Sequence, residues 1–299
     1  FRQWFRLKNF ANQKGVTILG DVPLYVSLDS ADVWGNQHLF HLDEEGQPIE
    51  IGGVPPDYFS ELGQLWGNPV YNWDALAKTD YQWWMARLHF NLHMYNRVRI
   101  DHFRGLVAFW SVPADAPNAI TGKWIPAHGA QVFENLMSHI EQLPIVAEDL
   151  GLITEDVNEL RDRFNLPGMK VLQFAFGDDP SNVHLPHNFV GRNVVYTGTH
   201  DNDTTLGWLN ELSDAEASLL KSYFGKDKSV YFDRLIDWAW QSTAELAIIP
   251  LQDVLKLDSS ARMNTPGTPT GNWRWRVPKS RLTAKAFRAI QMLNQKYNR

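Results

Sequence analysis

Six short apolar segments alternate with amphipathic helical patterns along the 299-residue chain. The apolar segments, each rich in Val, Ile, Leu or Phe and each ending near Gly, Asp or Pro, are residues 17–22, 98–100, 145–147, 170–176, 193–197 and 247–251. The helical patterns cover residues 3–13, 81–95, 130–141, 155–164, 214–224, 231–245 and 281–297. Strands that alternate with helices are typical of a parallel sheet with helical crossovers, so the sequence predicts an α/β fold.

The periodicity does not distinguish an open parallel sheet from a closed barrel. A closed barrel of alternating strands and helices has eight strands, and domains of this length are ordinary for it. If the barrel is closed, two strands lie before residue 1. We interpret residues 1–299 as one domain, and we expect Thr154 and Ser213 to be the N-caps of the helices that follow them.

One connection is unusually long. More than 50 residues, rich in Gly, Pro, Asp and aromatic side chains, separate the segment at 17–22 from the helical pattern at 81–95. Loops of this length inside a compact domain are usually functional. We therefore predict a subdomain, inserted at residues 23–75, that lies over the strand ends.

Composition excludes some classes of protein and disfavours others. The chain has no Cys, which excludes disulfides and thiolate metal sites, and its net charge of -6 disfavours a nucleic-acid partner. No apolar run approaches the roughly 18 to 20 residues of a membrane span. The 13 Trp, 16 Phe and 9 Tyr indicate either a large aromatic core or a groove that stacks on sugar rings, and composition alone favours the core.

Acidic side chains follow four of the predicted strands directly. Asp21, Asp101, Glu148 and Asp201 each stand where an apolar segment ends. Because ligands bind beyond the carboxyl ends of parallel strands, we expect these acids to share one rim. Gathered like charges repel, and such an arrangement is typical of a reaction that needs carboxyl groups with shifted pKa values.

Each acid also has a simpler interpretation. A lone Asp after a strand usually caps the next helix, and Asp149 beside Glu148 would then be a solvated neighbour. Asp201 and Asp203 offer oxygen ligands for Ca²⁺, but no EF-hand spacing follows them. Metal-assisted hydrolysis stays open, since His102 and His200 lie on the same predicted rim.

Arg99 stands two residues before Asp101 in the same predicted strand. Side chains two apart in a strand point the same way, so Arg99 is expected to hydrogen-bond Asp101 and lower its pKa. A carboxylate of low pKa suits nucleophilic attack. A second carboxyl of raised pKa would then serve as the proton donor.

Several strings are distinctive when taken together. They are Arg-Ile-Asp-His-Phe-Arg-Gly at 99–105, Ala-Glu-Asp-Leu-Gly at 147–151, Thr-His-Asp-Asn-Asp-Thr at 199–204, Gly-Asp-Val-Pro-Leu-Tyr-Val at 20–26, Gly-Val-Pro-Pro-Asp-Tyr-Phe-Ser at 53–60, Met-Asn-Thr-Pro-Gly-Thr at 263–268 and Gly-Asn-Trp at 271–273. With these strings the whole chain resembles the 4-α-glucanotransferases, also called amylomaltases or disproportionating enzymes, which are relatives of the α-amylases. The resemblance implies a (β/α)8 TIM-type barrel, incomplete at its N-terminus, whose third to eighth strands are the six predicted here.

The resemblance also implies roles for individual residues. Asp101 matches the nucleophile, Glu148 the general acid/base and Asp201 the third acid, which grips sugar hydroxyls. The residues that match substrate ligands are Asp21, Arg99, His200, Asp57, Tyr58, Phe59, Gln64 and Trp66, with weaker matches at Phe174 and Asn264. No metal and no other cofactor is implied. The implied partners are maltooligosaccharides and other α-1,4-glucans, and the implied compartment is the cytoplasm.

The implied chemistry is a double displacement that retains the α configuration, with the two reacting carboxyl groups roughly 5 to 5.5 Å apart. A sugar acceptor gives transfer, and water gives hydrolysis. Two alternatives stay open: an α-1,4-glucan hydrolase of the α-amylase type, which uses the same acids, and an inactive glucan-binding fragment. The oligomeric state is not predicted.

Overall fold

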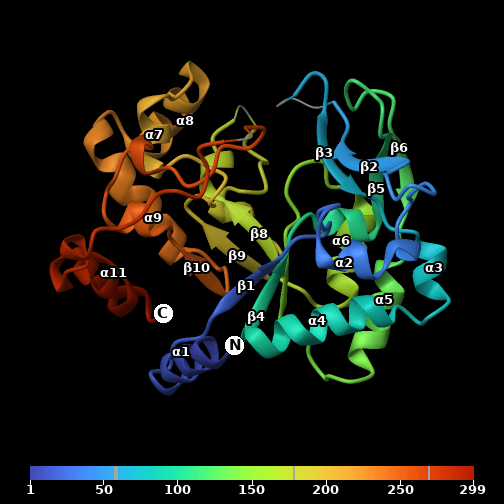
Figure 1. The fold of residues 1–299 in the computed structure, drawn as a ribbon. Coiled ribbons are helices and arrows are strands. Elements are labelled where there is room, and N and C mark those ends of the chain that lie inside the picture. The colour runs from blue at the N-terminus through green and yellow to red at the C-terminus, as the bar shows by residue number, and fades with distance from the viewer. Residues whose placement is uncertain (57–59, 178, 269) are drawn as a thin grey trace. The chain divides into compact units, whose positions relative to one another are not determined.

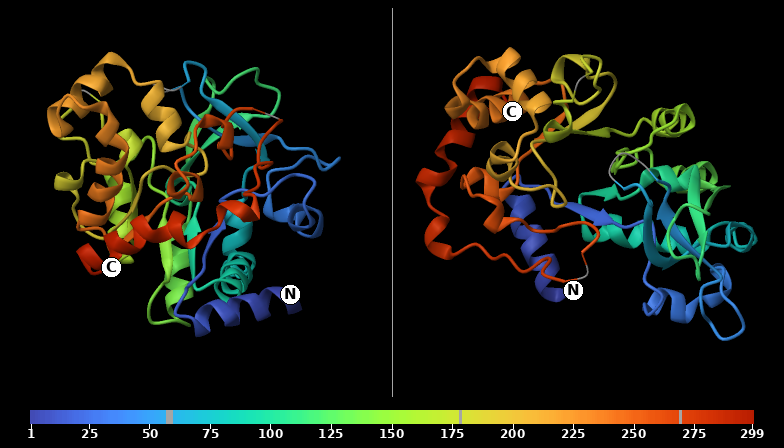
Figure 2. Two further views of the ribbon diagram at one scale, coloured as in Figure 1. Left: turned by 90° about the vertical axis from the view of Figure 1, so that its left-hand side faces the viewer. Right: turned by 90° about the horizontal axis from the view of Figure 1, so that it is seen from above.

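The computed structural model describes residues 1–56, 60–177, 179–268 and 270–299, and it shows a mixed α/β fold. This part of the chain divides into two compact units, Phe1–Gly168 and Met169–Arg299. Figures 1 and 2 show the elements of each unit. No described helix has both the length and the apolar character needed to cross a membrane.

The first unit contains helices and strands in alternation, with a group of short strands inserted. Its elements are α1 (Arg2–Gln13), β1 (Leu19–Val22), α2 (Ala31–Gly35), η1 (Gln37–Leu39), β2 (Glu50–Val54), β3 (Gln64–Pro69), α3 (Trp73–Ala77), α4 (Gln82–Met94), β4 (Arg97–Ile100), η2 (Phe103–Leu106), β5 (Ala108–Pro113), β6 (Lys123–Pro126), α5 (Gly129–Met137), β7 (Ile145–Ala147) and α6 (Glu155–Arg163), where η marks a 3-10 helix.

A three-stranded parallel sheet in the order β1-β4-β7 forms the centre of the first unit. In its register Asp21 lies opposite Arg99, and Arg99 lies opposite Val146. Helix α4 packs beside β1 and β4 (Figure 1). Because the three strands are parallel, the residues that follow them lie along one edge of the sheet.

A four-stranded antiparallel sheet in the order β3-β2-β5-β6 occupies part of the predicted insertion. Strands β2 and β3 lie within residues 23–75, but β2 also pairs with β5, which follows β4 in the chain. Our sequence analysis did not predict these strands. Gly52 and Gly53 have weak strand propensity, and the β2–β3 register shifts between Ile51 and Gly53, so no alternating pattern is visible. The domain boundaries 1–299 and 23–75 stay predictions.

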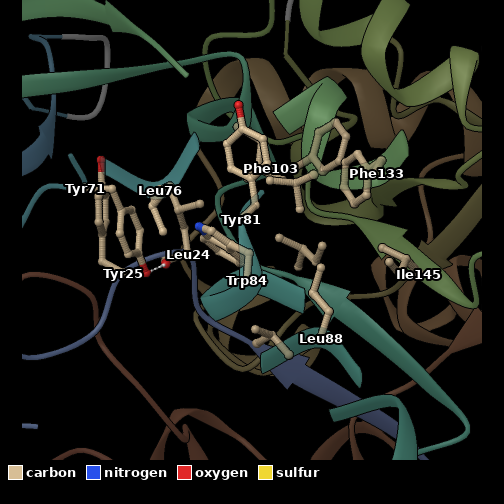
Figure 3. Packing of buried hydrophobic residues seen from close by; sticks show 14 of the residues in the cluster. Leu24, Tyr25, Tyr71, Leu76, Tyr81, Trp84, Leu88, Phe103, Phe133 and Ile145 are labelled. Atoms are coloured by element: carbon tan, nitrogen blue, oxygen red, sulfur yellow. Dashed lines mark hydrogen bonds between the residues drawn. The ribbon is translucent and has the colours of Figure 1, made fainter. Parts of the chain in front are cut away.

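Trp84 of α4 lies in the middle of the largest core cluster of the first unit (Figure 3). Its side chain is fully buried among aliphatic and aromatic neighbours such as Leu76, Leu88 and Phe103. The hydroxyl of Tyr71 donates a hydrogen bond of 2.7 Å to the carbonyl of Leu24, which satisfies its polar end inside the core. Much of the aromatic composition therefore serves the core.

The second unit contains a three-stranded parallel sheet in the order β10-β9-β8, surrounded by helices. Its elements are β8 (Gly168–Val171), η3 (Leu172–Phe174), η4 (Pro186–Asn188), β9 (Asn193–Tyr196), α7 (Thr205–Asn210), α8 (Asp214–Phe224), η5 (Lys228–Val230), α9 (Tyr231–Gln241), β10 (Leu246–Ile248), α10 (Leu251–Val254), η6 (Ser259–Ala261), η7 (Lys279–Arg281) and α11 (Ala284–Tyr297). Helix α11 packs on α9 (Figure 1). Lys296 of α11 forms an ion pair of 2.8 Å with Asp237 of α9.

All six predicted strands occur among the described residues, but of these six only 145–147 has the predicted bounds, and two of the others differ most. The strand predicted at 170–176 ends at Val171, and a 3-10 turn follows it. The strand predicted at 247–251 ends at Ile248, because Pro250 stops the ladder and α10 begins at Leu251. The closed eight-stranded barrel stays a prediction, since the strands form two separate three-stranded parallel sheets.

The two predicted N-caps have different outcomes. Ser213 forms a complete capping box with Glu216, as expected for the start of α8. Thr154 occupies the N-cap position of α6, but its side chain makes no capping bond. Its hydroxyl instead accepts a hydrogen bond of 2.8 Å from Arg104 and donates to Asp156, so tertiary contacts replace the cap.

Gly53 is expected to be required for the pairing of β2 with β3. A Cβ at this position would lie 2.2 Å from the carbonyl oxygen of Gln64, a backbone atom that has no room to move aside. We expect Gly53→Ala to lower the free energy of unfolding by about 1–3 kcal/mol in urea titrations. Gly35→Ala is the control, because its Cβ would meet no atom within 4 Å. Equal midpoints for the two variants would contradict this account.

Candidate active site

Arg99 links two of the predicted acids in the first unit. Its Nε and Nη2 donate to the two carboxylate oxygens of Asp21 at 2.9 and 2.7 Å, and Nη2 also donates to Asp101 at 2.8 Å. The guanidinium is buried, whereas both carboxylates keep partial exposure. Burial acts to lower the pKa of Arg99, but its bonds to Asp21 and the charges of Asp21, Asp101 and Glu148 raise it above its usual range.

The predicted bond between Arg99 and Asp101 is therefore confirmed, and the capping interpretation of Asp101 is wrong. The short helix after β4 begins at Phe103, and His102 is its N-cap residue. The backbone N–H of Asp101 donates to the carbonyl of Val22 at 2.9 Å, which extends the β1–β4 ladder by one residue. The lowered pKa expected for Asp101 stays a prediction.

Glu148 follows β7 at the same edge of the sheet. The backbone N–H of Glu148 donates to the carbonyl of Ile100 at 3.0 Å, and Oε2 of its carboxyl group accepts a hydrogen bond from the backbone N–H of His102 at 2.7 Å. Loss of water around the carboxyl raises the pKa of Glu148 well above its usual range, and the charge of Asp101 adds to the rise. The charge of Arg99 and the bond from His102 oppose this shift. The surroundings of Glu148 therefore favour the protonated form of its carboxyl.

Asp149, the neighbour of Glu148, has a structural role. Its side chain is buried and accepts a bond of 2.7 Å from Arg161 of α6. A Cβ on Gly168 would lie 2.3 Å from an oxygen of Asp149, so the fold leaves space for this carboxylate. The expectation of a solvated neighbour is therefore wrong for Asp149, because α6 closes over it.

Aromatic side chains from the insertion pack at this edge of the sheet. The rings of Trp66 and His102 meet edge to face, with 4.7 Å between centroids, and Tyr25 lies beside both. Trp66 also donates its indole N–H to Gln64 at 3.2 Å. Of the predicted covering residues, Gln64 and Trp66 are thus placed near one another.

The other three predicted covering residues, Asp57, Tyr58 and Phe59, lie outside the described residues.

Asp201 of the second unit lies in a network of its own. Its Oδ1 accepts the amide of Asn264 at 2.6 Å, and its Oδ2 lies 3.5 Å from Nε2 of His200. The N–H of Asn264 donates to the carbonyl of His200 at 3.1 Å, which fixes the loop at 264 to the end of β9. The structure thus brings together three predicted site residues, including one of the weaker matches.

Two residues that sequence reasoning did not single out belong to the same network. Arg262 donates to the carbonyl of Asp201 at 2.8 Å and to that of Asn264 at 2.8 Å. Trp273 lies over His200, with 5.1 Å between ring centroids, and is 55% exposed. Trp273 appeared in the Gly-Asn-Trp string, but nothing in its spacing indicated that it would reach His200.

Phe174 lies in η3 of the second unit, and no described contact joins it directly to Asp201. Its ring meets His184 edge to face, and the side chain is 37% exposed. The adjacent Gln173 donates to the carbonyl of Asp203 at 2.9 Å, which links η3 to the segment after β9. Phe174 is therefore tied to the Asp201 loop through its neighbour.

Among residues 1–56, 60–177, 179–268 and 270–299, no three His, Asp or Glu side chains are arranged to hold a metal ion. One of the two ring nitrogens of His102, Nε2, is buried. What the first unit does offer is a carboxylate paired with Arg99, Asp101, and a carboxyl of raised pKa, Glu148, at the ends of adjacent parallel strands. These are the two groups that a retaining glycosyl transfer requires.

Comparison with known proteins agrees with this arrangement. A sequence model of the family described as 4-alpha-glucanotransferase matches residues 1–283. The chain is 50% identical over 292 residues to a 4-alpha-glucanotransferase of Thermus thermophilus, covering 95% of this chain and 58% of the relative. It is 48% identical over 280 residues to the chloroplastic/amyloplastic 4-alpha-glucanotransferase of Solanum tuberosum, covering 93% of this chain and 49% of the relative.

Solved structures give the same result. The chain matches the amylomaltase of Streptococcus agalactiae in complex with acarbose with a TM-score of 0.95 and 39% identity, covering all of this chain and 61% of that one. An amylomaltase of Corynebacterium glutamicum, at 20% identity and a TM-score of 0.75, covers 91% of this chain and 44% of that one and supports the fold alone.

The chain therefore spans about half to three-fifths of the length of the relatives that it matches. The family model extends over both compact units, and so do the two sets of predicted site residues. On this sequence and structural evidence, the chain belongs to the 4-alpha-glucanotransferase family.

Proposed function

We propose that the chain is the larger part of the catalytic domain of a 4-α-glucanotransferase, which transfers α-1,4-glucan segments between maltooligosaccharides. One arrangement carries this proposal: Arg99 pairs with Asp101, while burial and the charge of Asp101 raise the pKa of Glu148 on the adjacent strand. The two carboxyl groups are thereby divided into a nucleophile and an acid. The family relationship and the names of the relatives support the same activity.

A closed (β/α)8 barrel is the architecture that best accounts for the two parallel sheets. Each sheet takes its strands in chain order, β1-β4-β7 and β8-β9-β10, with helices in the connections. A right-handed succession of such units closes at eight strands. The six strands are then the third to the eighth of the barrel, and the high TM-score to an amylomaltase supports this assignment.

In the first displacement, Asp101 attacks the anomeric carbon of an α-1,4-linked glucose, and Glu148 protonates the departing oxygen. A covalent glycosyl-enzyme forms through an oxocarbenium-like transition state. In the second displacement, Glu148 is the base that deprotonates the incoming acceptor. Two inversions retain the α configuration, and they require the carboxyl groups to lie roughly 5 to 5.5 Å apart.

Substrate binding is assigned to the polar side chains around these acids. Asp21, anchored by Arg99, presents a partly exposed carboxylate to sugar hydroxyls. Asp201 is the third acid, and His200 and Asn264 orient its carboxylate through the contacts described above. Hydrogen bonds to hydroxyls that strengthen in the transition state favour the distorted ring. Phe174 offers an exposed ring for stacking.

Transfer rather than hydrolysis requires that water be excluded while a sugar occupies the acceptor side. The segment that includes Gln64 and Trp66, with residues 57–59, is the proposed cover. Trp66 packs against His102, which places its indole beside the edge of the sheet that carries Glu148.

For the bacterial type of this enzyme we propose the cytoplasm as the compartment, whereas the plant relatives are chloroplastic or amyloplastic by name.

Asp101→Asn and Glu148→Gln are expected to abolish or strongly reduce conversion of maltotriose by the full chain. Glu148→Gln should lower the rate on the order of 10²- to 10⁴-fold, because the leaving oxygen loses its proton donor. Chromatography of the products is the measurement. The exposed Asp115→Asn is the control. Products longer than maltotriose together with glucose indicate transfer, whereas glucose and maltose alone would contradict the proposed transferase.

Glu148→Gln is expected to stabilise the protein increasingly as pH rises. A raised pKa in the folded state means that stability is fully present below the unfolded pKa and is lost as pH increases through the folded pKa. Between the two pKa values the gain of the variant grows by up to about 1.4 kcal/mol per pH unit. Urea unfolding from about pH 5 to pH 8 measures it.

The exposed Glu141→Gln is the control for this titration, and its curve should stay parallel to that of the wild-type protein. Asp101→Asn, made alone and in combination with Glu148→Gln, completes a double-mutant cycle with the wild-type protein and Glu148→Gln. Because the charge of Asp101 contributes to the raised pKa of Glu148, the pH-dependent gain should be smaller in the Asp101→Asn background. Parallel curves for all variants would contradict the assignment of the proton to Glu148.

Trp66→Ala is expected to raise the ratio of hydrolysis to transfer, because removing the indole opens the proposed cover to water. The ratio of reducing ends formed to oligosaccharides lengthened measures the effect. Trp34→Ala is a matched control, since this Trp is 82% exposed. An unchanged ratio in Trp66→Ala would remove the covering segment from the account of transfer.

A further inference from the structure

His102 has a backbone conformation that is uncommon for residues other than glycine. It lies between β4 and η2 with φ of 52°, in the left-handed region that non-glycine residues rarely adopt. Such a conformation costs on the order of 1–3 kcal/mol and persists only where surrounding contacts enforce it. In this conformation the N–H of His102 reaches Oε2 of Glu148 at 2.7 Å. The following N–H, of Phe103, donates to the carbonyl of Glu148 at 3.1 Å.

This hydrogen bond distinguishes the two oxygens of the Glu148 carboxyl. In a protonated carboxyl, one oxygen carries the proton and the other is the better acceptor. Because the N–H of His102 occupies Oε2, the proton is directed to Oε1. When Glu148 releases that proton, the same N–H stabilises the negative charge that develops, as a preorganised backbone donor does elsewhere.

The imidazole of His102 has the contacts of a packing group rather than those of a proton carrier. Its Nε2 is buried and has no hydrogen-bond partner within the described part of the chain. The ring meets Trp66 edge to face, and Gly105 leaves space for it, since a Cβ there would lie 2.9 Å from Cδ2 of His102. Burial lowers the pKa of His102 to about 4, with a further contribution from Arg104, so the ring is neutral where Glu148 titrates.

We propose that His102 is a positioning residue for the acid: its packed ring holds residue 102 left-handed, and its backbone N–H fixes the proton of Glu148 on Oε1. The inference rests on the proposed function only for the role of Glu148. The imidazole itself does not contact the reacting atoms in this account. What matters chemically is the backbone N–H, which the ring keeps in place.

The test compares His102→Gly with His102→Val in the full chain. Gly adopts a left-handed conformation without strain and keeps the N–H in place, whereas a β-branched residue strongly disfavours that conformation. Both variants lose the ring, so a difference between them isolates the backbone. If His102→Val does not fold, His102→Ala replaces it, because Ala also disfavours positive φ.

The experiment measures single-turnover rates with two glycosyl donors. Maltotriose has an oxygen leaving group that needs the proton of Glu148, whereas α-maltotriosyl fluoride releases fluoride with little need for acid. We expect His102→Gly to lose less activity on maltotriose than His102→Val, because Gly adopts the left-handed conformation without strain. His102→Val should fall by about tenfold or more on maltotriose and stay near wild type on the fluoride.

Two results would overturn the proposal: equal losses in His102→Gly and His102→Val, or an equal loss on both donors in His102→Val. The first would show that the left-handed backbone of residue 102 does not set the rate, and the second would assign the effect to substrate binding or folding. A wild-type chain that releases no fluoride would instead count against the proposed function, and the two failures are thus distinguishable.

A second measurement tests the proposal without catalysis. The bond from His102 favours the ionised form of Glu148, so its loss should raise the folded pKa further and reduce stability at high pH. The charged groups that face Glu148, namely Asp101, Arg99 and Asp149, are unchanged in both variants, as is Arg104 beside the ring. The difference in unfolding free energy between His102→Gly and His102→Val should grow from about pH 5 to pH 9. A constant difference would overturn the proposal.

Discussion

The buried guanidinium of Arg99 makes the contacts on which the predicted site residues of the first unit depend. A buried cation without partners is strongly destabilising, and Arg99 is stabilised by Asp21 on the neighbouring strand and Asp101 at the end of its own. The register of β1 with β4, which sets Asp21 opposite Arg99, therefore fixes the chemistry of the site as well as the sheet. Without Arg99, the carboxylates of Asp21 and Asp101 would repel each other and the nearby Glu148.

Asp101 and Glu148 follow adjacent parallel strands, yet the two carboxyl groups have different surroundings. Asp101 is partly exposed and bonded to a guanidinium, whereas Glu148 has lost most of its water and has one backbone N–H for a partner. The charge of Asp101 adds to the raised pKa of Glu148, because two negative charges at neighbouring strand ends are unfavourable. The proposed nucleophile and the proposed acid are thus coupled, and a change to either carboxyl is expected to alter the titration of the other.

Sequence patterns predict those parts of the site that follow from strand periodicity. The two-residue spacing of Arg99 and Asp101 is enough to predict their bond, and apolar segments that end in acids locate Glu148. Other parts depend on backbone geometry or on contacts between distant residues, which no local pattern encodes. The left-handed conformation of His102 is one example, and the reach of Arg262 to Asp201 across 61 residues is another. The β2–β5 pairing was missed for the same reason, since paired glycines in β2 give no alternating pattern.

Each unit holds its own proposed site residues through bonds within that unit. In the first, Arg99 and the N–H of His102 fix two carboxyl groups; in the second, Asn264 and Arg262 fix Asp201. Side chains fixed in this way lose little further freedom when substrate binds, so binding energy remains for ring distortion and charge stabilisation. The strain at His102 fits this view, because an unfavourable backbone conformation is stable only where dense packing enforces it. The ring of His102 contributes to that packing through its edge-to-face contact with Trp66, and the backbone N–H of the same residue bonds Glu148.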